Sequence, residues 1–317
     1  MRVLVTGGSG FLGLELVRRL AERGETVIAA DTVVSPRLQS LVQAHGNVVA
    51  IAVDITDLAG LAMAFRQHRP QAVVHCAAVV GVPASLGSPA NVLRVNVQGS
   101  LNVLEAMRLY DAARFVHLSS EEVYGDFDTD VVTEEHPLRP LMPYGISKVA
   151  VEHFGRTYAQ LHGLECVNVR TSWVYGIWLD RPRPPMNYLN AALRDEPLHV
   201  EAGADTMIDY TYVDDVVDGL VRVLDHPRHA HDAYHIASGR AISEGDLVDA
   251  IRELLPRARI AVGPGRREFV PGVPVPRKGA LDCSRAAREL GYTPRYDVRA
   301  GMAAYVQAWQ RRAAGRT

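Results

Sequence analysis

Val3-Leu4-Val5-Thr6-Gly7-Gly8-Ser9-Gly10-Phe11-Leu12-Gly13 is the stretch of sequence that decides the fold of this chain. Its first four residues are apolar or β-branched, which predicts a strand buried on both faces. Glycines then fall at positions 7, 10 and 13, and leucines at 12, 16 and 20 recur at a spacing that places them on one face of a helix. The stretch therefore predicts a strand, a tight glycine turn and a helix, in that order.

The glycine turn is suited to hold a phosphate group. A turn that leads from a strand into a helix offers free backbone N–H groups and the positive end of the helix dipole. Gly7 permits the turn, Gly10 lets the backbone come close to a pyrophosphate, and Gly13 lets the helix pack against the strand. Because the spacing is G-x-x-G-x-x-G and not the commoner G-x-G-x-x-G, the turn is a weak signal by itself and needs support from the residues that follow.

An acidic residue gives that support. Thr26 to Ala30 is a second apolar run, and it ends in Asp31. A carboxylate about 20 residues beyond the glycines can accept hydrogen bonds from a ribose 2′-hydroxyl, and it repels the 2′-phosphate of NADP. We therefore predict NAD as the cofactor, with NADP as the alternative because Arg37 lies close in sequence. The alternative is that Asp31 is a solvated acid at the end of a strand and has no role in binding.

Strand-like and helix-like segments alternate through the first half of the chain. Strands are expected at 48–53, 72–78, 115–120 and 166–169, and helices at 38–44, 58–67, 95–108 and 147–161. This alternation predicts an α/β fold of the Rossmann type, a doubly wound parallel sheet whose ligand lies beyond the carboxyl ends of the strands.

The C-terminal part is expected to form a smaller α/β domain that binds the substrate. The proline-rich segment 178–185 and the segment 263–279, rich in Gly, Pro and Arg, are expected to be loops, and the second is expected to carry ligand contacts. Strands are expected at 208–213 and 234–237, and Asp214 and Asp215 are interpreted as caps of the helix between them. We assign residues 1–172 and about 208–235 to an NAD-binding domain, and about 173–207 and 236–317 to the substrate-binding domain.

A tyrosine and a lysine four residues apart form the candidate catalytic pair. Tyr144 and Lys148 share one face of the helix expected there. A phenol has an ordinary pKa near 10, and a neighbouring ammonium is expected to lower it. Ser120, at the end of the strand at 115–120, can hold a substrate hydroxyl and pass its proton to Tyr144 while a hydride leaves the same carbon. A buried tyrosine beside a solvated lysine is the alternative.

These motifs resemble the extended short-chain dehydrogenase/reductase family, which includes the NAD-dependent nucleotide-sugar epimerases and dehydratases. The resemblance covers nearly the whole chain. It implies that Asp54 and Ile55 flank the adenine, that Lys148 also holds the nicotinamide ribose, and that the protein is a homodimer through the helices near 95–108 and 147–161. The segments that carry the resemblance are Thr6–Gly13, Asp54-Ile55, His75–Ala78, Asn96, Ser119-Ser120, Val123–Gly125, Tyr144-x-x-x-Lys148 and Tyr212–Asp215. The expected cofactor-binding residues are Gly7, Gly10, Phe11, Leu12, Gly13, Asp31, Asp54, Ile55, Ala77, Ala78, Asn96, Ser119, Tyr144 and Lys148.

Two glutamates, Glu121 and Glu122, stand directly before Val123-Tyr124-Gly125. In the family that the chain resembles, epimerases usually carry small or neutral residues at these two positions, sugar 4,6-dehydratases carry two acids, and sugar-acid decarboxylases carry one. Eliminating water from the carbons beyond a transient ketone needs one acid and one base. We therefore expect both glutamates to be catalytic. The alternative is that Glu121 is exposed and Glu122 only orients a neighbour.

Two departures from the family pattern concern the substrate. Trp173 stands where the family usually has an asparagine that contacts the substrate diphosphate, and the run around it is similar to the nucleotide-sugar reductases of the same family. Ile208 stands where an arginine usually precedes the Asp209 strand. Either other basic residues supply the charge, or the substrate has no diphosphate. The expected substrate-binding residues are Trp173, Arg266, Arg267, Arg277 and Lys278.

Composition excludes several classes of protein. The chain of 317 residues has 48% hydrophobic and 22% charged residues and a net charge of −2, which argues against a nucleic-acid or membrane-surface protein. No apolar run is long enough for a membrane span, and no signal peptide is recognised. The three scattered cysteines fit a reducing compartment, so we expect a cytoplasmic protein. The histidines at 226, 229 and 231 are interpreted as a solvated loop, and no metal is expected.

Three hypotheses of function follow. The first is an NAD-dependent sugar-modifying enzyme of the nucleotide-sugar epimerase or dehydratase type, with the hydride returned to the substrate. The second is an NAD-dependent dehydrogenase of an unphosphorylated sugar, sugar acid or other secondary alcohol, with NADH released. The third is an NAD-sensing regulatory protein. The intact Ser120, Tyr144 and Lys148 argue against the third, because a sensor has no need of a proton relay.

Overall fold

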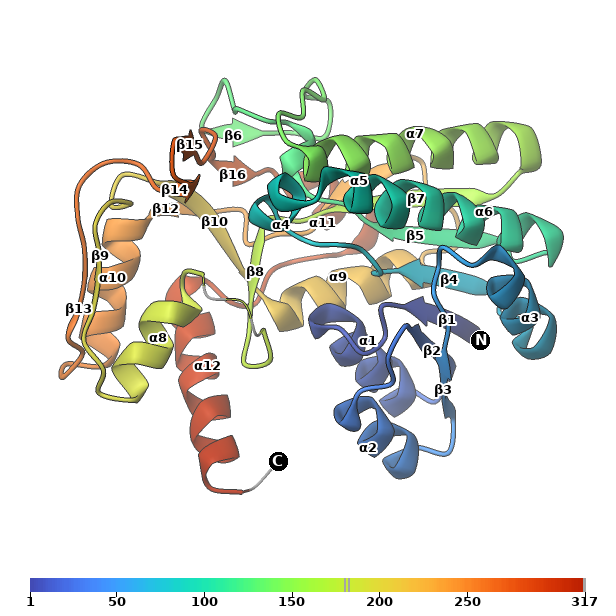
Figure 1. Ribbon diagram of the computed structural model, residues 1–317, viewed down its shortest axis with the longest axis horizontal. Coiled ribbons are helices and arrows are strands. Elements are labelled where there is room, and N and C mark those ends of the chain that lie inside the picture. The colour runs from blue at the N-terminus through green and yellow to red at the C-terminus, as the bar shows by residue number, and fades with distance from the viewer. Residues whose placement is uncertain (180, 182, 316–317) are drawn as a thin grey trace.

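A computed structural model of the chain describes residues 1–179, 181 and 183–315. Its main element is a parallel sheet with the strand order β11-β7-β5-β4-β1-β2-β3 (Figure 1). All neighbouring strands in it pair in parallel, which confirms the predicted doubly wound sheet. The strands are β1 (Arg2–Thr6), β2 (Thr26–Asp31), β3 (Val48–Ala52), β4 (Ala72–His75), β5 (Arg114–Leu118), β7 (Glu165–Arg170) and β11 (Ala233–His235).

Helices cover both faces of this sheet, as its strand pattern requires (Figure 1). Along β1, Val3 and Val5 face one helix layer and Leu4 faces the other, so successive side chains enter two separate cores. The first layer holds α1 (Phe11–Glu22), α2 (Pro36–Ala44) and α9 (Val213–Asp225). The second holds α3 (Leu58–His68), α6 (Ser100–Leu109) and α7 (Pro143–His162).

The segment between β4 and α6 differs from the single helix expected over 95–108. Two short helices, α4 (Val82–Gly87) and α5 (Pro89–Val92), come first, and a π-helical stretch at Leu93–Gly99 leads into α6. Prolines at 83 and 89 interrupt the helical run, because proline is tolerated only in the first turn of a helix. A π-helical stretch often marks a functional site.

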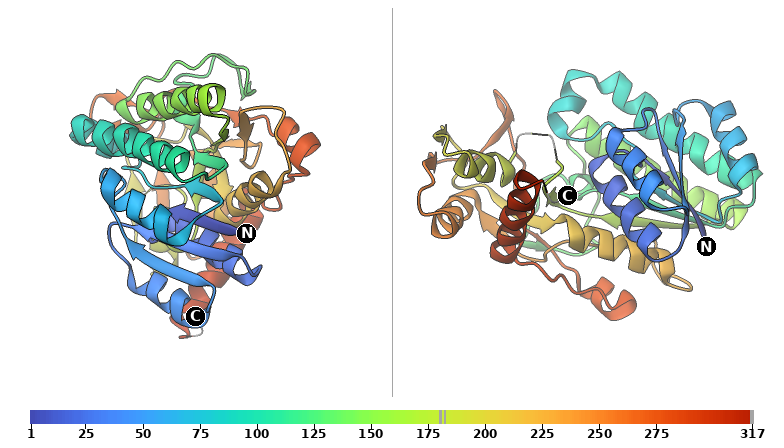
Figure 2. Two further views of the ribbon diagram at one scale, coloured as in Figure 1. Left: turned by 90° about the vertical axis from the view of Figure 1, so that its right-hand side faces the viewer. Right: turned by 90° about the horizontal axis from the view of Figure 1, so that it is seen from below.

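The smaller part of the molecule lies beyond the carboxyl ends of the large sheet (Figure 2). Its three-stranded sheet has the order β12-β10-β8. The strands are β8 (Trp173–Tyr175), β10 (Met207–Tyr212) and β12 (Ala241–Ser243). Further pairs join β9 (Leu198–Val200) to β13 (Ile260–Val262), β14 (Glu268–Val270) to β15 (Val273–Pro274), and β6 (Val131–Val132) to β16 (Ala280–Leu281). The helices are α8 (Met186–Leu193), α10 (Glu244–Leu254), α11 (Ser284–Leu290) and α12 (Val298–Ala313).

The domain boundary expected at about residue 208 differs from this topology. β10 pairs with β8 and β12 and so belongs to the small sheet. The chain returns to the large sheet only with α9 and β11. Asp209 on β10 is completely buried and accepts hydrogen bonds from the backbone N–H groups of Ser238, Gly239 and Leu281. This carboxylate therefore ties the small sheet to two later segments of the chain.

The aspartates at the start of α9 also differ from their predicted role. The helix begins at Val213 without a side-chain cap. Asp215 accepts hydrogen bonds from the backbone N–H groups of Arg295 and Tyr296, at 3.0 Å each, and so anchors the segment before α12. In the described part of the chain, no helix has the length and apolar character that a membrane crossing needs.

Candidate active site

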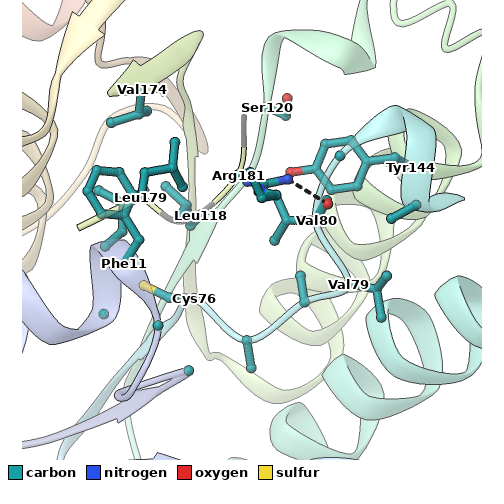
Figure 3. Close-up of a pocket in the computed structure, with 18 of the residues that line it drawn as sticks. Phe11, Cys76, Val79, Val80, Leu118, Ser120, Tyr144, Val174, Leu179 and Arg181 are labelled. Atoms are coloured by element: carbon teal, nitrogen blue, oxygen red, sulfur yellow. Dashed lines mark hydrogen bonds between the residues drawn. The ribbon is translucent and has the colours of Figure 1, made fainter. Parts of the chain in front are cut away.

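A cavity of about 1080 Å³ opens at the carboxyl ends of β1, β2, β4 and β5 and extends to β8 and the β14 segment (Figure 3). Ligands of open α/β sheets bind at this place, where the strand order reverses between β1 and β4. Most residues that were expected to bind the cofactor line it: Gly7, Gly10, Phe11, Leu12, Gly13, Asp31, Asp54, Ile55, Ala77, Ala78, Ser119, Tyr144 and Lys148.

The glycine turn is packed so tightly that side chains are excluded from it. Gly7 has a φ of +70°, and a Cβ there would lie 2.8 Å from the backbone nitrogen of Ala77. A Cβ on Gly13 would lie 2.0 Å from the carbonyl oxygen of Gly7. The helix α1 that follows has no side-chain cap on its first turn. Its first N–H groups and its positive dipole end are therefore available to an anion at this edge of the cavity.

The carboxylate of Asp31 is held in place at the end of β2. It accepts hydrogen bonds from the backbone N–H groups of Ser9, at 3.0 Å, and Thr32, at 2.8 Å. Arg37, the residue behind the NADP alternative, also lines the cavity, and its guanidinium lies 3.8 Å from the centroid of the Trp178 ring. The fixed carboxylate of Asp31 therefore lines the same cavity as the glycine turn.

Asn96 does not line the cavity, unlike the other residues expected to bind the cofactor. Its side chain accepts a hydrogen bond from the Val79 backbone N–H at 2.7 Å and donates to the Val79 carbonyl and the Ser147 hydroxyl. Val79 lines the cavity, so Asn96 acts behind the lining, from the π-helical stretch, by fixing that segment. Asp54 lines the cavity, and a hydrogen bond from the Thr56 backbone lowers the pKa of its carboxyl group.

Tyr144 and Lys148 lie on α7 and both line the cavity, but the expected effect of Lys148 on Tyr144 is wrong. Burial raises the pKa of Tyr144 to about 12, and the cations that oppose this rise are Arg181 and Arg183. The Lys148 ammonium donates to the Leu118 carbonyl at 2.6 Å and lies 5.8 Å from the centroid of the Tyr144 ring. Burial also lowers the pKa of Lys148, to about 8. Lys148 is therefore oriented by β5.

The serines after β5 hold the segment that carries the two glutamates. Ser119 donates a hydrogen bond to the buried Glu152 at 2.7 Å. Ser120 accepts one from the backbone N–H of Glu122 at 3.2 Å, and it lines the cavity on the same side as Tyr144 (Figure 3). The nearby Ser120 hydroxyl opposes the rise that burial causes in the pKa of the Tyr144 phenol. The serine and the tyrosine of the predicted relay are thus brought together.

Both glutamates line the cavity, and the alternative that Glu121 is exposed is wrong. Glu121 is only 1% exposed. Its Oε2 accepts a hydrogen bond from Ser172 at 2.7 Å, whereas its Oε1 is buried without a partner among the described residues. Burial raises the pKa of Glu121 to about 7, an effect that Lys278 opposes. Glu122 lies beside Lys278, with 3.4 Å between Oε2 and Nζ.

The residues expected to bind the substrate are only partly brought together. Trp173 and Arg267 line the cavity, and Arg267 is ion-paired with Glu244. Arg266 and Arg277 do not line it. Arg277 is half exposed and ion-paired with Asp130 at 2.7 Å, because the chain at this point runs along the outside of the β6–β16 pair. Lys278 is buried behind Glu122.

Three further arginines at the cavity were missed from the sequence: Arg94 in the π-helical stretch, and Arg181 and Arg183. Arg181 donates to the Val80 carbonyl at 2.7 Å (Figure 3). The guanidinium of Arg183 lies 5.5 Å from the centroid of the Trp173 ring, and its Nε is buried without a partner among the described residues. Burial lowers the pKa of Arg183 to about 10. Arg181 and Arg183 follow β8 in the proline-rich loop, of which Asp180 and Pro182 lie outside the described residues. Their position after the end of a strand was the one sequence feature that could have indicated a place in the cavity.

Two histidines of the loop after α9 lie beside glutamates, and burial lowers the pKa of His229. His229 lies 2.7 Å from Glu165, and His231 lies 3.3 Å from Glu289. In the described ranges no group of three or more His, Cys, Asp or Glu side chains is arranged to hold a metal ion.

Comparison with known proteins identifies relatives over nearly the whole chain. Residues 3–237 match the model of the NAD dependent epimerase/dehydratase family. The dTDP-glucose 4,6-dehydratase of Xanthomonas campestris pv. campestris is 32% identical over 95% of this chain and 90% of its own length. The UDP-glucose 4-epimerase of Mycolicibacterium smegmatis is 34% identical over 97% of this chain and 98% of its own.

A solved structure agrees with these relatives. The dTDP-glucose 4,6-dehydratase DesIV from Streptomyces venezuelae, whose crystal structure has NAD bound, is similar with a TM-score of 0.86 and 28% identity. The match covers 99% of this chain and 98% of that chain.

Proposed function

The chain belongs to the NAD-dependent epimerase/dehydratase family and is an NAD-dependent enzyme of the nucleotide-sugar epimerase and dehydratase type; within this family, we propose that it eliminates water from a nucleotide sugar. The observation that carries this proposal is the buried carboxyl pair, Glu121 and Glu122, in the same cavity as Tyr144.

The residues of the first half of the cavity fit NAD. The glycine turn lines the cavity next to an uncapped helix N-terminus and carries no side chain at Gly7, Gly10 or Gly13, which suits a pyrophosphate. Asp31 would accept from the adenosine ribose, Asp54 and Ile55 would flank the adenine, and Lys148 would hold the nicotinamide ribose. NAD supplies a hydride acceptor at this place, and the protein has to move the protons.

The proton of the sugar hydroxyl is the task of Ser120 and Tyr144. The Ser120 Oγ would hold the hydroxyl, and the Tyr144 Oη would accept its proton as the carbon is oxidised. Burial favours the neutral, protonated form of the Tyr144 phenol. The positive charges of Arg181 and Arg183 act in the opposite direction and assist the loss of its proton. The hydrogen bond to the Leu118 carbonyl holds the Lys148 ammonium at a fixed distance from the Tyr144 ring.

Elimination is the task of the two glutamates. Loss of water from neighbouring carbons breaks one C–H and one C–O bond and forms one C=C bond. It needs a base that takes the carbon-bound proton and an acid that protonates the leaving hydroxyl. Two carboxyl groups at one place, held with different surroundings, are suited to divide these roles.

The substrate diphosphate would meet arginines other than those predicted. Arg183 presents a buried Nε without a partner among the described residues, and Arg181 and Arg267 line the same space. Guanidinium groups bind phosphate oxygens with paired hydrogen bonds. These side chains would compensate for Trp173 and Ile208, the positions where the family's usual phosphate contacts are replaced.

The test is incubation of the purified protein with dTDP-glucose, UDP-glucose and UDP-glucuronic acid in the presence of NAD. A product whose mass is lower by one water, without net NADH, supports the proposal. An unchanged mass with inverted stereochemistry would instead establish an epimerase. Glu122→Gln is the control, and it should abolish the loss of water while NAD still binds.

A dehydrogenase that acts on a sugar without a diphosphate is the second candidate, and the apolar ring of Trp173 in the cavity favours it. This enzyme would accumulate NADH during turnover, which an elimination with hydride return does not. Thermal unfolding in the presence of UDP or dTDP separates the two candidates further, because only an enzyme of nucleotide sugars should be stabilised.

We further propose a homodimer through α6 and α7, which pack against one another on one side of the sheet. Large apolar side chains on or next to these helices are exposed, among them Leu109 (52%), Ile146 (46%) and Leu161 (67%). Light scattering should give twice the mass of the chain, and Leu161→Glu should shift it toward the monomer.

A further inference from the structure

The two acidic groups of the cavity share one basic neighbour from a distant part of the chain. Lys278 precedes β16, and its side chain is completely buried. Its Nζ lies 3.4 Å from Glu122 Oε2, 3.3 Å from the Gly125 carbonyl and 5.3 Å from the centroid of the Phe127 ring. A buried ammonium is retained only where a counter-ion faces it. Within the described ranges, the carboxylate in ion-pair distance of Lys278 is Glu122.

The position of Lys278 is fixed by the backbone around it. Ala280 pairs with Val131 in the β6–β16 ladder, and a Cβ on Gly279 would lie 2.1 Å from the Asp130 carbonyl. The backbone N–H of Phe127 donates to the Arg277 carbonyl at 2.8 Å. The ammonium is therefore held against the segment that carries Glu122.

The other carboxyl group has surroundings that favour a proton. Glu121 accepts one hydrogen bond, from Ser172, and its Oε1 has no donor among the described residues. A charge on Glu122 or on the buried Asp209 opposes a charge on Glu121, whereas Lys278 and Arg183 favour it. A carboxylate with one buried and unsatisfied oxygen is costly, and a neutral carboxyl can place its O–H toward a ligand in the cavity.

We propose that Lys278 is a positioning residue that holds the negative charge of the carboxyl pair on Glu122 and so leaves the proton on Glu121. With one ammonium and two carboxyl groups, the site is neutral when it holds one proton. Glu121 is then the acid that protonates the leaving hydroxyl, and Glu122 is the base that takes the carbon-bound proton. These roles rest on the function proposed above, whereas the distribution of charge does not.

The composition of the chain agrees with a special role for this lysine. The chain has 34 lysines and arginines, and all of them except Lys148 and Lys278 are arginines. Both lysines are buried next to the cavity. An ammonium is a compact charge that can face one carboxylate, whereas the wider guanidinium spreads its charge over several donors.

The first experiment locates the proton in the protein itself. Infrared spectra of the NAD-loaded wild type near pH 6 are compared with those of Glu121→Gln and of Ser172→Ala, which removes the hydrogen bond to Glu121 Oε2. The band of a protonated carboxyl should disappear in Glu121→Gln and change its frequency in Ser172→Ala. Because Asp209 is common to all variants, its own contribution cancels. A band that keeps its frequency in Ser172→Ala would overturn the proposal, because the protonated carboxyl would then not be Glu121.

The second experiment removes the charge. Lys278→Met is compared with Arg277→Met, in which the exposed neighbour paired with Asp130 is replaced. Loss of the ammonium removes the positive charge that favours the ionised form of Glu122, an effect that is generally worth about 1–3 pKa units for an opposite charge at this distance. Turnover needs Glu122 ionised, so the rising limb of its pH profile should move up by at least about one unit. At a fixed pH on this acid limb, turnover should then fall about tenfold or more, and it should recover toward higher pH.

The outcomes are distinguishable from a failure of the proposed function. Arg277→Met should keep the wild-type profile. A Lys278→Met variant that folds and shows the wild-type profile and carboxyl band would overturn the proposal. If Lys278→Met does not fold, the spectra of Glu121→Gln and Ser172→Ala decide. If the wild type turns over no nucleotide sugar, the proposed function fails, and the infrared comparison still tests the charge distribution.

Discussion

Tyr144 shows how strongly burial acts on a single side chain in this cavity. Its pKa is raised to about 12 despite Arg181 and Arg183, so the phenol is neutral near pH 7 and its proton affinity is high. Replacing Tyr144 by phenylalanine should lower turnover about 10²- to 10⁴-fold, because the proton acceptor is lost. The dissociation constant of NADH, measured by fluorescence, should change little. Tyr158→Phe, on the same helix but bonded to Glu105, is the control and should keep its turnover. Near-normal turnover of Tyr144→Phe would exclude the assignment.

Asp31 is the residue on which the choice of cofactor depends. Asp31→Asn keeps the size of the side chain and an acceptor for the Ser9 or Thr32 N–H, but it removes the charge that repels a 2′-phosphate. The preference for NADH over NADPH, measured as the ratio of dissociation constants, should fall at least about tenfold. An unchanged ratio, or a wild type that binds both cofactors equally, would contradict this role.

At this scale the sequence predicts the residues that sit at strand ends and on helices. The glycine turn, Asp31 and the two glutamates follow a regular strand, so their place in the cavity is fixed by the fold. Arg181 and Arg183 could not be predicted, because a proline-rich loop has no period from which the direction of a side chain follows. The pKa of Tyr144 could not be predicted either, since it depends on burial and on the orientation of Lys148 by the Leu118 carbonyl.

At the scale of elements, α7 and β7 are joined by a buried ion pair behind the cavity. Arg170 and Glu152 are both almost fully buried, with two hydrogen bonds between them at 3.0 and 2.6 Å, and Glu152 also accepts from Ser119. Glu152→Gln leaves the guanidinium charge buried and unpaired, so it should reduce the free energy of unfolding by about 3–5 kcal/mol. Urea unfolding measures this.

A matched surface variant gives the scale for that loss. Glu22→Gln removes the exposed ion pair with Arg18 on α1 and should cost less than about 1 kcal/mol. Equal losses in the two variants would mean that the buried pair contributes no more than a surface pair.

The same elements show which parts of the fold follow from local pattern. The strands of the large sheet are continuous apolar runs, so their existence and parallel order could be predicted. The short strands of the smaller part could not, because β6, β15 and β16 are each two residues long and exist only through their partners. The assignment of β10 to the small sheet depends on pairing with β8, which contributes three residues and no period of its own.

At the scale of the whole molecule, Asp209 joins distant parts of the chain. Its carboxylate accepts hydrogen bonds from Ser238, Gly239 and Leu281, and also from the Thr211 hydroxyl. In Asp209→Asn the amide N–H₂ would face backbone donors and leave at least one of them unsatisfied. The free energy of unfolding should fall by about 1–3 kcal/mol, as measured by thermal or urea unfolding. Asp249→Asn, at an exposed ion pair on α10, should stay close to wild type.

The late position of Lys278 in the chain has a consequence for synthesis on the ribosome. The large sheet is complete once β11 has emerged, and the glycine turn and Asp31 are present long before that. A nascent chain at this stage already has the parts that recognise the cofactor, and domains generally fold as units from the N-terminus during translation. The ammonium that balances Glu122 is added only later, after β15 and before β16. An mRNA truncated after the codons of β11 should therefore yield a polypeptide that binds NAD but does not turn over a sugar. During translation, cofactor binding would thus precede the ability to perform acid–base catalysis.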